Sequence, residues 1–152
     1  MSIIKTFRGR IPMGTEEKLH LSTNDGLTGY RIKKFKVIST IPHNIDVAIV
    51  AKIRLTSDSN IGPTVNFEDT DLIAVNAYED RSSGNLPTHE TIIFDLETFN
   101  QDIFISMSDA DGNTTPGNYY LELEQFKLDL NTSTYHTLKN IRSTSEIGFT
   151  IV

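Results

Sequence analysis

Apolar side chains recur at every second position through most of the chain, and this period limits the fold more than any other feature. Val47, Ile49, Ala51, Ile53 and Leu55 show it most clearly. A period of two places these side chains on one face of a β-strand, whereas a helix repeats every 3.6 residues. The same pattern predicts strands at residues 3–11, 17–23, 30–38, 47–55, 72–78, 91–94, 103–107, 119–130 and 147–152.

The strand predicted at residues 119–130 changes phase partway along its length. Its apolar residues form two sets on opposite faces, Tyr119, Leu121 and Leu123 followed by Phe126, Leu128 and Leu130. A β-bulge near Gln125 would reconcile the two sets, as would a strand that passes from one sheet to the other.

One segment has helical spacing. In residues 132–142, Tyr135, Leu138 and the Ile141–Arg142 pair are spaced to share one face of a short helix, which Asn131 or Thr132 could cap. Turn residues such as Asn24-Asp25-Gly26 and polar loops at 57–71, 80–89 and 109–118 separate the strands. We therefore expect an all-β fold, a single jelly-roll-like β-sandwich over residues 1–152 with at most this one short helix.

The chain contains no cysteine, which excludes disulfides, thiolate nucleophiles and cysteine-ligated zinc. Its first ten residues lack the apolar stretch of a signal peptide, and no run approaches the ~18 apolar residues of a membrane span. We expect no membrane partner.

Charge is divided unevenly along the sequence. Residues 1–56 hold ten Lys/Arg against four Asp/Glu, whereas residues 57–152 hold four against sixteen, within a total net charge of −6. Strands from the two halves could neutralise each other inside one fold, which we favour, or opposite charges could bring copies together head to tail.

The sequence shows no catalytic motif. The four histidines (His20, His43, His89 and His136) lack metal-ligand spacing, and both a nucleophile elbow and a phosphate-binding glycine loop are missing. Glu122 and Glu124 could act as paired carboxylates in acid–base chemistry, but alternating glutamates more often form the solvent face of a strand. We expect neither an enzyme nor a cofactor.

A metal site has one weak candidate, formed by Asp109, Asp111 and Asn113. The segment begins like a calcium loop, but an EF-hand needs glycine at its sixth position and glutamate at its twelfth. Thr114 and Tyr120 occupy those positions, so the segment reads as a turn between strands.

A basic segment is the best candidate for binding a partner. It comprises Arg31, Lys33, Lys34 and Lys36, to which we add Arg8, Arg10 and, as complementary acids, Glu122 and Glu124. Basic residues beside aromatic ones also resemble single-strand nucleic-acid platforms. The acidic remainder of the chain would repel phosphate, so we expect protein contact rather than nucleic acid.

Several segments, which together span nearly the whole chain, resemble small proteins of tailed bacteriophages that infect aquatic bacteria. They are Ile3–Arg10, Gly29–Phe35, Glu90–Asp95, Phe99–Ile103, Asn118–Gln125 and Leu138–Arg142. The resemblance implies a virion component assembled in the host cytoplasm, with copies of itself or the major capsid protein as partners.

We therefore expect a structural virion protein, either a capsid decoration or minor capsid subunit or a head–tail or tail component. The alternative is a module that binds glycans or the host surface through the polar loops.

Overall fold

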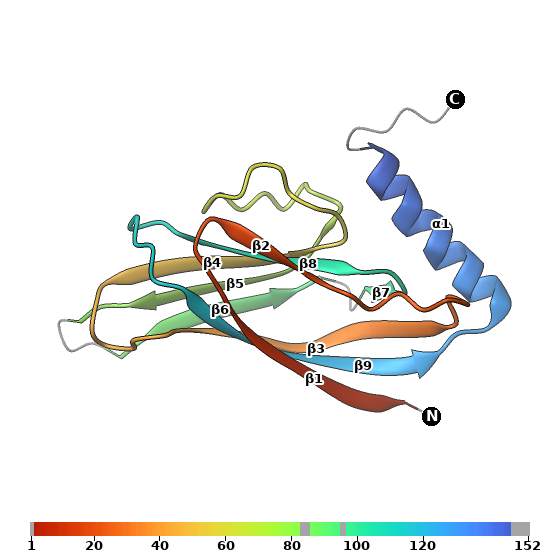
Figure 1. The fold of residues 1–152 in the computed structure, drawn as a ribbon, viewed down its shortest axis with the longest axis horizontal. Coiled ribbons are helices and arrows are strands. Elements are labelled where there is room, and N and C mark those ends of the chain that lie inside the picture. The colour runs from red at the N-terminus through yellow and green to blue at the C-terminus, as the bar shows by residue number, and fades with distance from the viewer. Residues whose placement is uncertain (1, 83–85, 95–96, 147–152) are drawn as a thin grey trace.

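The computed structural model describes residues 2–82, 86–94 and 97–146, which form two packed antiparallel β-sheets with a helix at one end (Figure 1). Nine strands and one helix follow in chain order: β1 (Ile3–Ile11), β2 (Thr15–Leu19), β3 (Thr28–Ser39), β4 (Val47–Arg54), β5 (Leu72–Asp80), β6 (Thr88–Ile93), β7 (Thr98–Phe99), β8 (Ile103–Asp109), β9 (Gly117–Lys127) and α1 (Leu130–Glu146). The predicted all-β sandwich is confirmed. The strand predicted at 147–152 lies outside the described residues.

The chain changes sheet at most of its connections. One sheet has the strand order β1-β9-β3-β7 and the other β2-β8-β4-β5-β6, so only β4, β5 and β6 are both consecutive in sequence and adjacent in space. Two sheets joined by such repeated crossings are the arrangement of a jelly roll. The order also gives the four-stranded sheet a centre made of β9 and β3.

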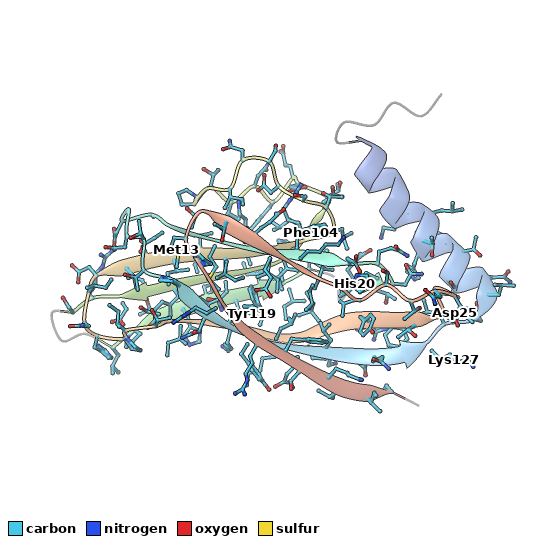
Figure 2. The ribbon with its side chains drawn as sticks, viewed as in Figure 1. Met13, His20, Asp25, Phe104, Tyr119 and Lys127 are labelled. Atoms are coloured by element: carbon cyan, nitrogen blue, oxygen red, sulfur yellow. The ribbon has the colours of Figure 1, made fainter. Side chains whose placement is uncertain are left out.

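The period of two in the sequence produces the core. Val47, Ile49, Ala51 and Ile53 point from β4 into the space between the sheets, and each is at most 1% exposed. Phe35 and Phe99 from the facing sheet are fully buried there. Side chains from both sheets fill this interior (Figure 2).

The expected bulge at Gln125 is wrong. β9 keeps a regular register past this residue, with Gln125 opposite Ile3 on one side and Tyr30 on the other. The irregularity lies instead in β3, where Lys33 is the extra residue between Ile32 and Lys34. Phe126 continues the alternation onto the outer face, and Leu128 lies beyond the end of the strand.

The helix is longer than predicted and has a different cap. The Asp129 carboxylate accepts a hydrogen bond from the Thr132 backbone N–H at 2.7 Å, and the Asp129 carbonyl accepts one from Ser133. Asp129 therefore caps α1, rather than Asn131 or Thr132. An ionised cap at a helix start is also favoured by the helix dipole.

The three polar loops do not gather at one end of the sandwich. Loop 57–71 folds back over the outer face of the five-stranded sheet, where Lys52 donates to the Thr64 carbonyl at 2.9 Å and Arg54 pairs with Asp69 at 2.8 Å. The loops after β5 and β8 are joined by the Arg81–Asp111 pair at 2.6 Å. Among the described residues, no hydrogen bond or ion pair joins loop 57–71 to the other two loops.

We expect Asp102→Asn to weaken the sandwich at neutral pH. Burial raises the pKa of Asp102, but hydrogen bonds from Ser22, Leu21 and Lys18 outweigh it and lower the pKa from 3.8 to about 2. Because folding lowers this pKa, the ionised carboxylate stabilises the folded state at pH values above the pKa of the unfolded chain. This contribution of about 2 kcal/mol is lost as the pH falls from about 4 to about 2. Chemical unfolding should therefore show a gap between wild type and variant at pH 7 that narrows below pH 4; a gap independent of pH would contradict this account.

Candidate functional site

The residues predicted to bind a partner come together on the outer face of the four-stranded sheet. Strand register places Arg8 and Arg10 of β1, Glu122 and Glu124 of β9, and Arg31, Lys34 and Lys36 of β3 on this face, with Lys33 exposed at the bulge. These residues are far apart in the sequence, and antiparallel pairing of β9 with both neighbours brings them together.

One half of this face is electrically balanced. Arg31 lies 3.6 Å from Glu124, and its guanidinium stacks over the Phe126 ring at 5.0 Å from the ring centre. Lys34 stands opposite Glu122 in the register. The predicted pairing of the basic strand with the acidic one is confirmed here, and it leaves Glu122 and Glu124 as surface charges beside cations.

The other half of the face is positive. Two rows cross β1, β9 and β3 in register: Arg8, Tyr120 and Lys36 form the first, and Arg10, Asn118 and Ile38 the second. Within the described part of the chain, no carboxylate oxygen lies within 4.0 Å of a charged nitrogen of Arg8, Arg10 or Lys36. We call these two rows the cationic rows.

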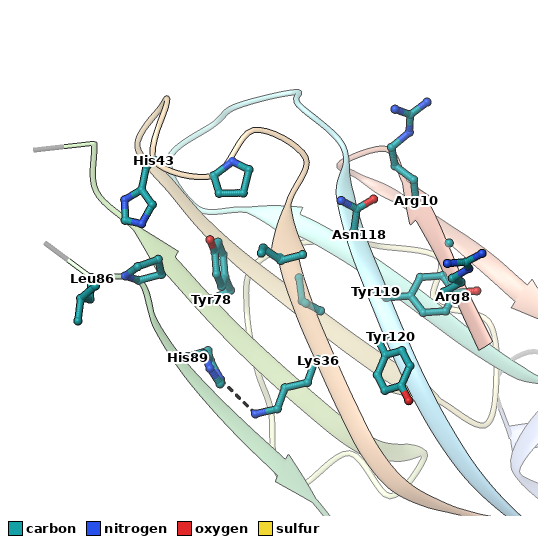
Figure 3. Close-up of a pocket in the computed structure, with 15 residues that line it drawn as sticks. Arg8, Arg10, Lys36, His43, Tyr78, Leu86, His89, Asn118, Tyr119 and Tyr120 are labelled. Atoms are coloured by element: carbon teal, nitrogen blue, oxygen red, sulfur yellow. Dashed lines mark hydrogen bonds between the residues drawn. The ribbon is translucent and has the colours of Figure 1, made fainter. Parts of the chain in front are cut away.

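The cationic rows form one side of a groove of about 1160 Å³ (Figure 3). Its other side comes from the turn at Pro42 and His43 and from the segment that leads into β6, where Leu86 is 84% exposed. His89 of β6 lies within 3.4 Å of the Lys36 ammonium. The described lining contains two arginines, one lysine and two histidines but no Asp or Glu.

His43 is held at the groove by a buried carboxylate. Its backbone has a φ of 62°, and its N–H donates to the fully buried Asp80 at 2.7 Å. The Tyr78 hydroxyl donates to the same oxygen at 3.1 Å. Burial and the neighbouring Asp80 raise the pKa of Tyr78 to about 12, so the phenol stays protonated and keeps this bond at neutral pH.

A second unusual surface lies on α1, at the other end of the sandwich from the β3–β4 turn (Figure 1). Leu130, Tyr135 and Leu138 are 73%, 62% and 58% exposed. Tyr135 and Leu138 are three residues apart and share one side of the helix, whereas Leu130 is the first helical residue and lies nearer the side of Thr137, seven residues further on. We call Tyr135 and Leu138 the α1 stripe; their predicted grouping is correct, but the stripe faces away from the sandwich.

Polar contacts fix the opposite side of α1 to the sandwich. The buried Asn100 amide donates to the Thr137 hydroxyl at 2.8 Å, to the Gly26 carbonyl at 3.0 Å and to the Ser133 carbonyl at 3.3 Å. The Ser133 hydroxyl also donates to Gly26 at 2.6 Å. Lys139 pairs with Glu97 nearby. The usual amphipathic arrangement, apolar side inward, is therefore reversed.

The calcium candidate has its side chains bonded to protein groups. Asp109 accepts from the backbone N–H groups of Ala48 and Asp111, Asp111 pairs with Arg81, and Asn113 donates to the Asp46 carbonyl. Among the described residues, no three His, Asp or Glu side chains lie close enough together to hold a metal ion.

Sequence reasoning identified the arginines and lysines of this face but not the rest of the groove. His43, Leu86, His89, Asn118 and Tyr120 reach it from segments that only the fold unites. No described helix is both long and apolar enough to cross a membrane. Comparison of the sequence with protein-family models and with curated proteins finds no match.

Proposed function

We propose that this protein is a structural assembly subunit and that its copies associate through the α1 stripe. The supporting observation is the orientation of α1: the large apolar side chains of Tyr135 and Leu138 point into water, while the polar side of the same helix is bonded to the sandwich. Contiguous exposed apolar patches on soluble monomers commonly mark interaction sites. Burying such surface contributes about 25 cal/mol for each Å² removed from water.

A second copy of the chain is the occupant we favour for the α1 stripe. Most soluble oligomers are formed by identical chains, and the commonest symmetry is a two-fold axis, about which a surface contacts itself. An apolar stripe is complementary to itself in this way, because it needs no opposite charge across the axis. The cationic rows lack that property, since two positive surfaces repel.

The setting that we propose for this assembly is a bacteriophage particle, as a capsid decoration or minor capsid subunit or a head–tail or tail component. This part of the proposal rests on the resemblance to small phage proteins, and the jelly roll agrees with it because many viral capsid domains have that fold. Fold alone does not assign function, so α1 remains the main support. The major capsid protein is a further partner in this setting.

Sedimentation velocity over a wide range of protein concentration tests the proposal. We expect the purified chain to sediment as a multiple of its 17.1 kDa mass, with the fraction of oligomer rising with concentration. A chain that stays monomeric at the highest concentration would overturn association through α1. In purified particles, mass spectrometry should find the protein in many copies, and its absence would remove the phage setting.

A further inference from the structure

We propose that the groove beside the cationic rows is a binding site for an acidic polysaccharide whose sugar rings bear carboxylates. This function is separate from assembly, because the groove and the α1 stripe lie on different parts of the domain (Figures 1 and 3). Three properties of the groove support it: the charge of its lining, the placement of one aromatic ring, and the apolar side opposite that ring.

The charge of the lining favours an anionic ligand. Arg8, Arg10 and Lys36 have no carboxylate partner within the described residues, whereas the His43 ring lies 3.4 Å from the buried Asp80 carboxylate. This occurs in a chain with a net charge of −6, so the local excess of cations is not a property of the whole surface. Arginine in particular can bind a carboxylate through two parallel hydrogen bonds.

Tyr120 provides a platform between two of these cations. In the first cationic row it stands between Arg8 and Lys36, and strands spaced about 4.8 Å apart give this row a width of about 10 Å. The Tyr120 hydroxyl donates to Glu122 at 2.8 Å, which holds the ring in place. A sugar ring lying on the phenol would therefore have a cation on either side to receive its carboxylate.

The second row and the facing side supply the remaining contacts. Asn118, between Arg10 and Ile38, offers an amide that can both donate to and accept from sugar hydroxyls. Across the groove, Pro42, Leu86 and Pro87 present apolar surface. Ligand sites commonly combine predominantly apolar walls with a few well-placed polar groups.

Two other polyanions fit the groove less well. Single-stranded nucleic acid is bound on successive exposed aromatic side chains, whereas of the three tyrosines that line the groove only Tyr120 is exposed, and Tyr78 and Tyr119 are buried. An added peptide strand needs a free sheet edge. The β3 edge beside the groove is partly occupied, because the Phe35 carbonyl already accepts hydrogen bonds from the Asn76 and Thr91 side chains.

Titration of the whole protein with an oligogalacturonate, followed by calorimetry, tests the site. Arg10→Gln or Lys36→Gln should each weaken binding about tenfold, which corresponds to about 1.4 kcal/mol. Lys34→Gln is the matched control, since it removes the same charge from the same strand outside the groove, and it should change affinity less than about twofold. All three side chains lie on the surface, and thermal unfolding checks that each variant is folded.

The identity of the ligand is tested with matched polymers. Tyr120→Ala should weaken oligogalacturonate binding and leave the weaker binding of polyglutamate of equal charge unchanged, because only the sugar uses the ring. A neutral glucose oligomer should not bind measurably. The proposal would be overturned by no oligogalacturonate binding, by equal losses in Lys34→Gln and Lys36→Gln, or by tighter binding of polyglutamate or single-stranded DNA.

Discussion

Leu138→Glu is expected to keep the protein monomeric at concentrations where the wild type associates. The substitution places a charge in the α1 stripe, where association would remove it from water without a partner. Glutamate has a good helix propensity and Leu138 is 58% exposed, so the helix and the sandwich should stay intact. Sedimentation velocity should show a loss of self-affinity of about a hundredfold or more, with an unchanged circular-dichroism spectrum.

Leu86→Glu is the control for this variant. It makes the same chemical change at a leucine that is even more exposed, but in the groove rather than on α1. We expect it to associate as the wild type does. Equal loss of association in both variants would mean that added negative charge, rather than the α1 stripe, controls the oligomer.

Phe35→Ala should cost about 3–5 kcal/mol of unfolding free energy. The ring is fully buried between the sheets, and its removal leaves a cavity in the middle of β3. Since domains of this size are stable by only about 5–15 kcal/mol, the variant should be near the limit of folding at physiological temperature. Unfolding by guanidinium, followed by tyrosine fluorescence, measures the change.

Phe67→Ala is the matched control for the core. Phe67 is 60% exposed and meets the edge of the Phe94 ring at 5.2 Å between ring centres. Its loss should cost about 1 kcal/mol or less, the range for a single aromatic pair. If both phenylalanines proved equally important, the interior would not lie where the period of two places it.

The sequence was sufficient to predict eight of the nine described strands, all but the two-residue β7, because the signal for a strand is local. The alternation in Val47, Ile49, Ala51 and Ile53 depends only on neighbouring positions, and all four side chains enter the core. The bulge was misplaced for the same reason. Leu128 is out of phase with Leu123 because it lies beyond the strand, and the true bulge at Lys33 depends on pairing with β9.

The orientation of α1 could not be read from its own residues. Spacing correctly grouped Tyr135 with Leu138, but which side of a helix faces the domain depends on what the domain offers. Here it offers the Asn100 amide and the Gly26 carbonyl, so Ser133 and Thr137 turn inward. The reversed orientation is the feature from which we infer a partner.

The groove was missed because it is a product of register. Arg8, Tyr120 and Lys36 become neighbours only when β1 and β3 pair with β9 at these positions. Part of this face could be predicted from the sequence. Arg8 and Arg10 are two residues apart, as are Lys34 and Lys36, so each pair projects from one face of its strand. No sequence pattern predicted that His43 and Leu86 would line the groove, because both lie in connections between strands whose position depends on the whole fold.

Assembly and polysaccharide binding would use different parts of one jelly roll. Known jelly rolls include both capsid and lectin domains, so the two roles are compatible within a single fold. A dimer formed through α1 would present two grooves together, and linked sites bind polymers more tightly than single ones. The two proposals nevertheless stand on different residues and can fail independently.

The burial of the α1 stripe can be measured by thiol labelling. The chain has no cysteine, so Leu138→Cys introduces a single reactive thiol at the stripe, and Leu86→Cys introduces one in the groove. As protein concentration rises and the oligomer forms, maleimide labelling of the Leu138→Cys thiol should slow at least about tenfold, in proportion to the fraction of oligomer. Labelling of the Leu86→Cys thiol should keep its rate. If the Leu138→Cys thiol reacts equally fast in monomer and oligomer, α1 is not the assembly surface.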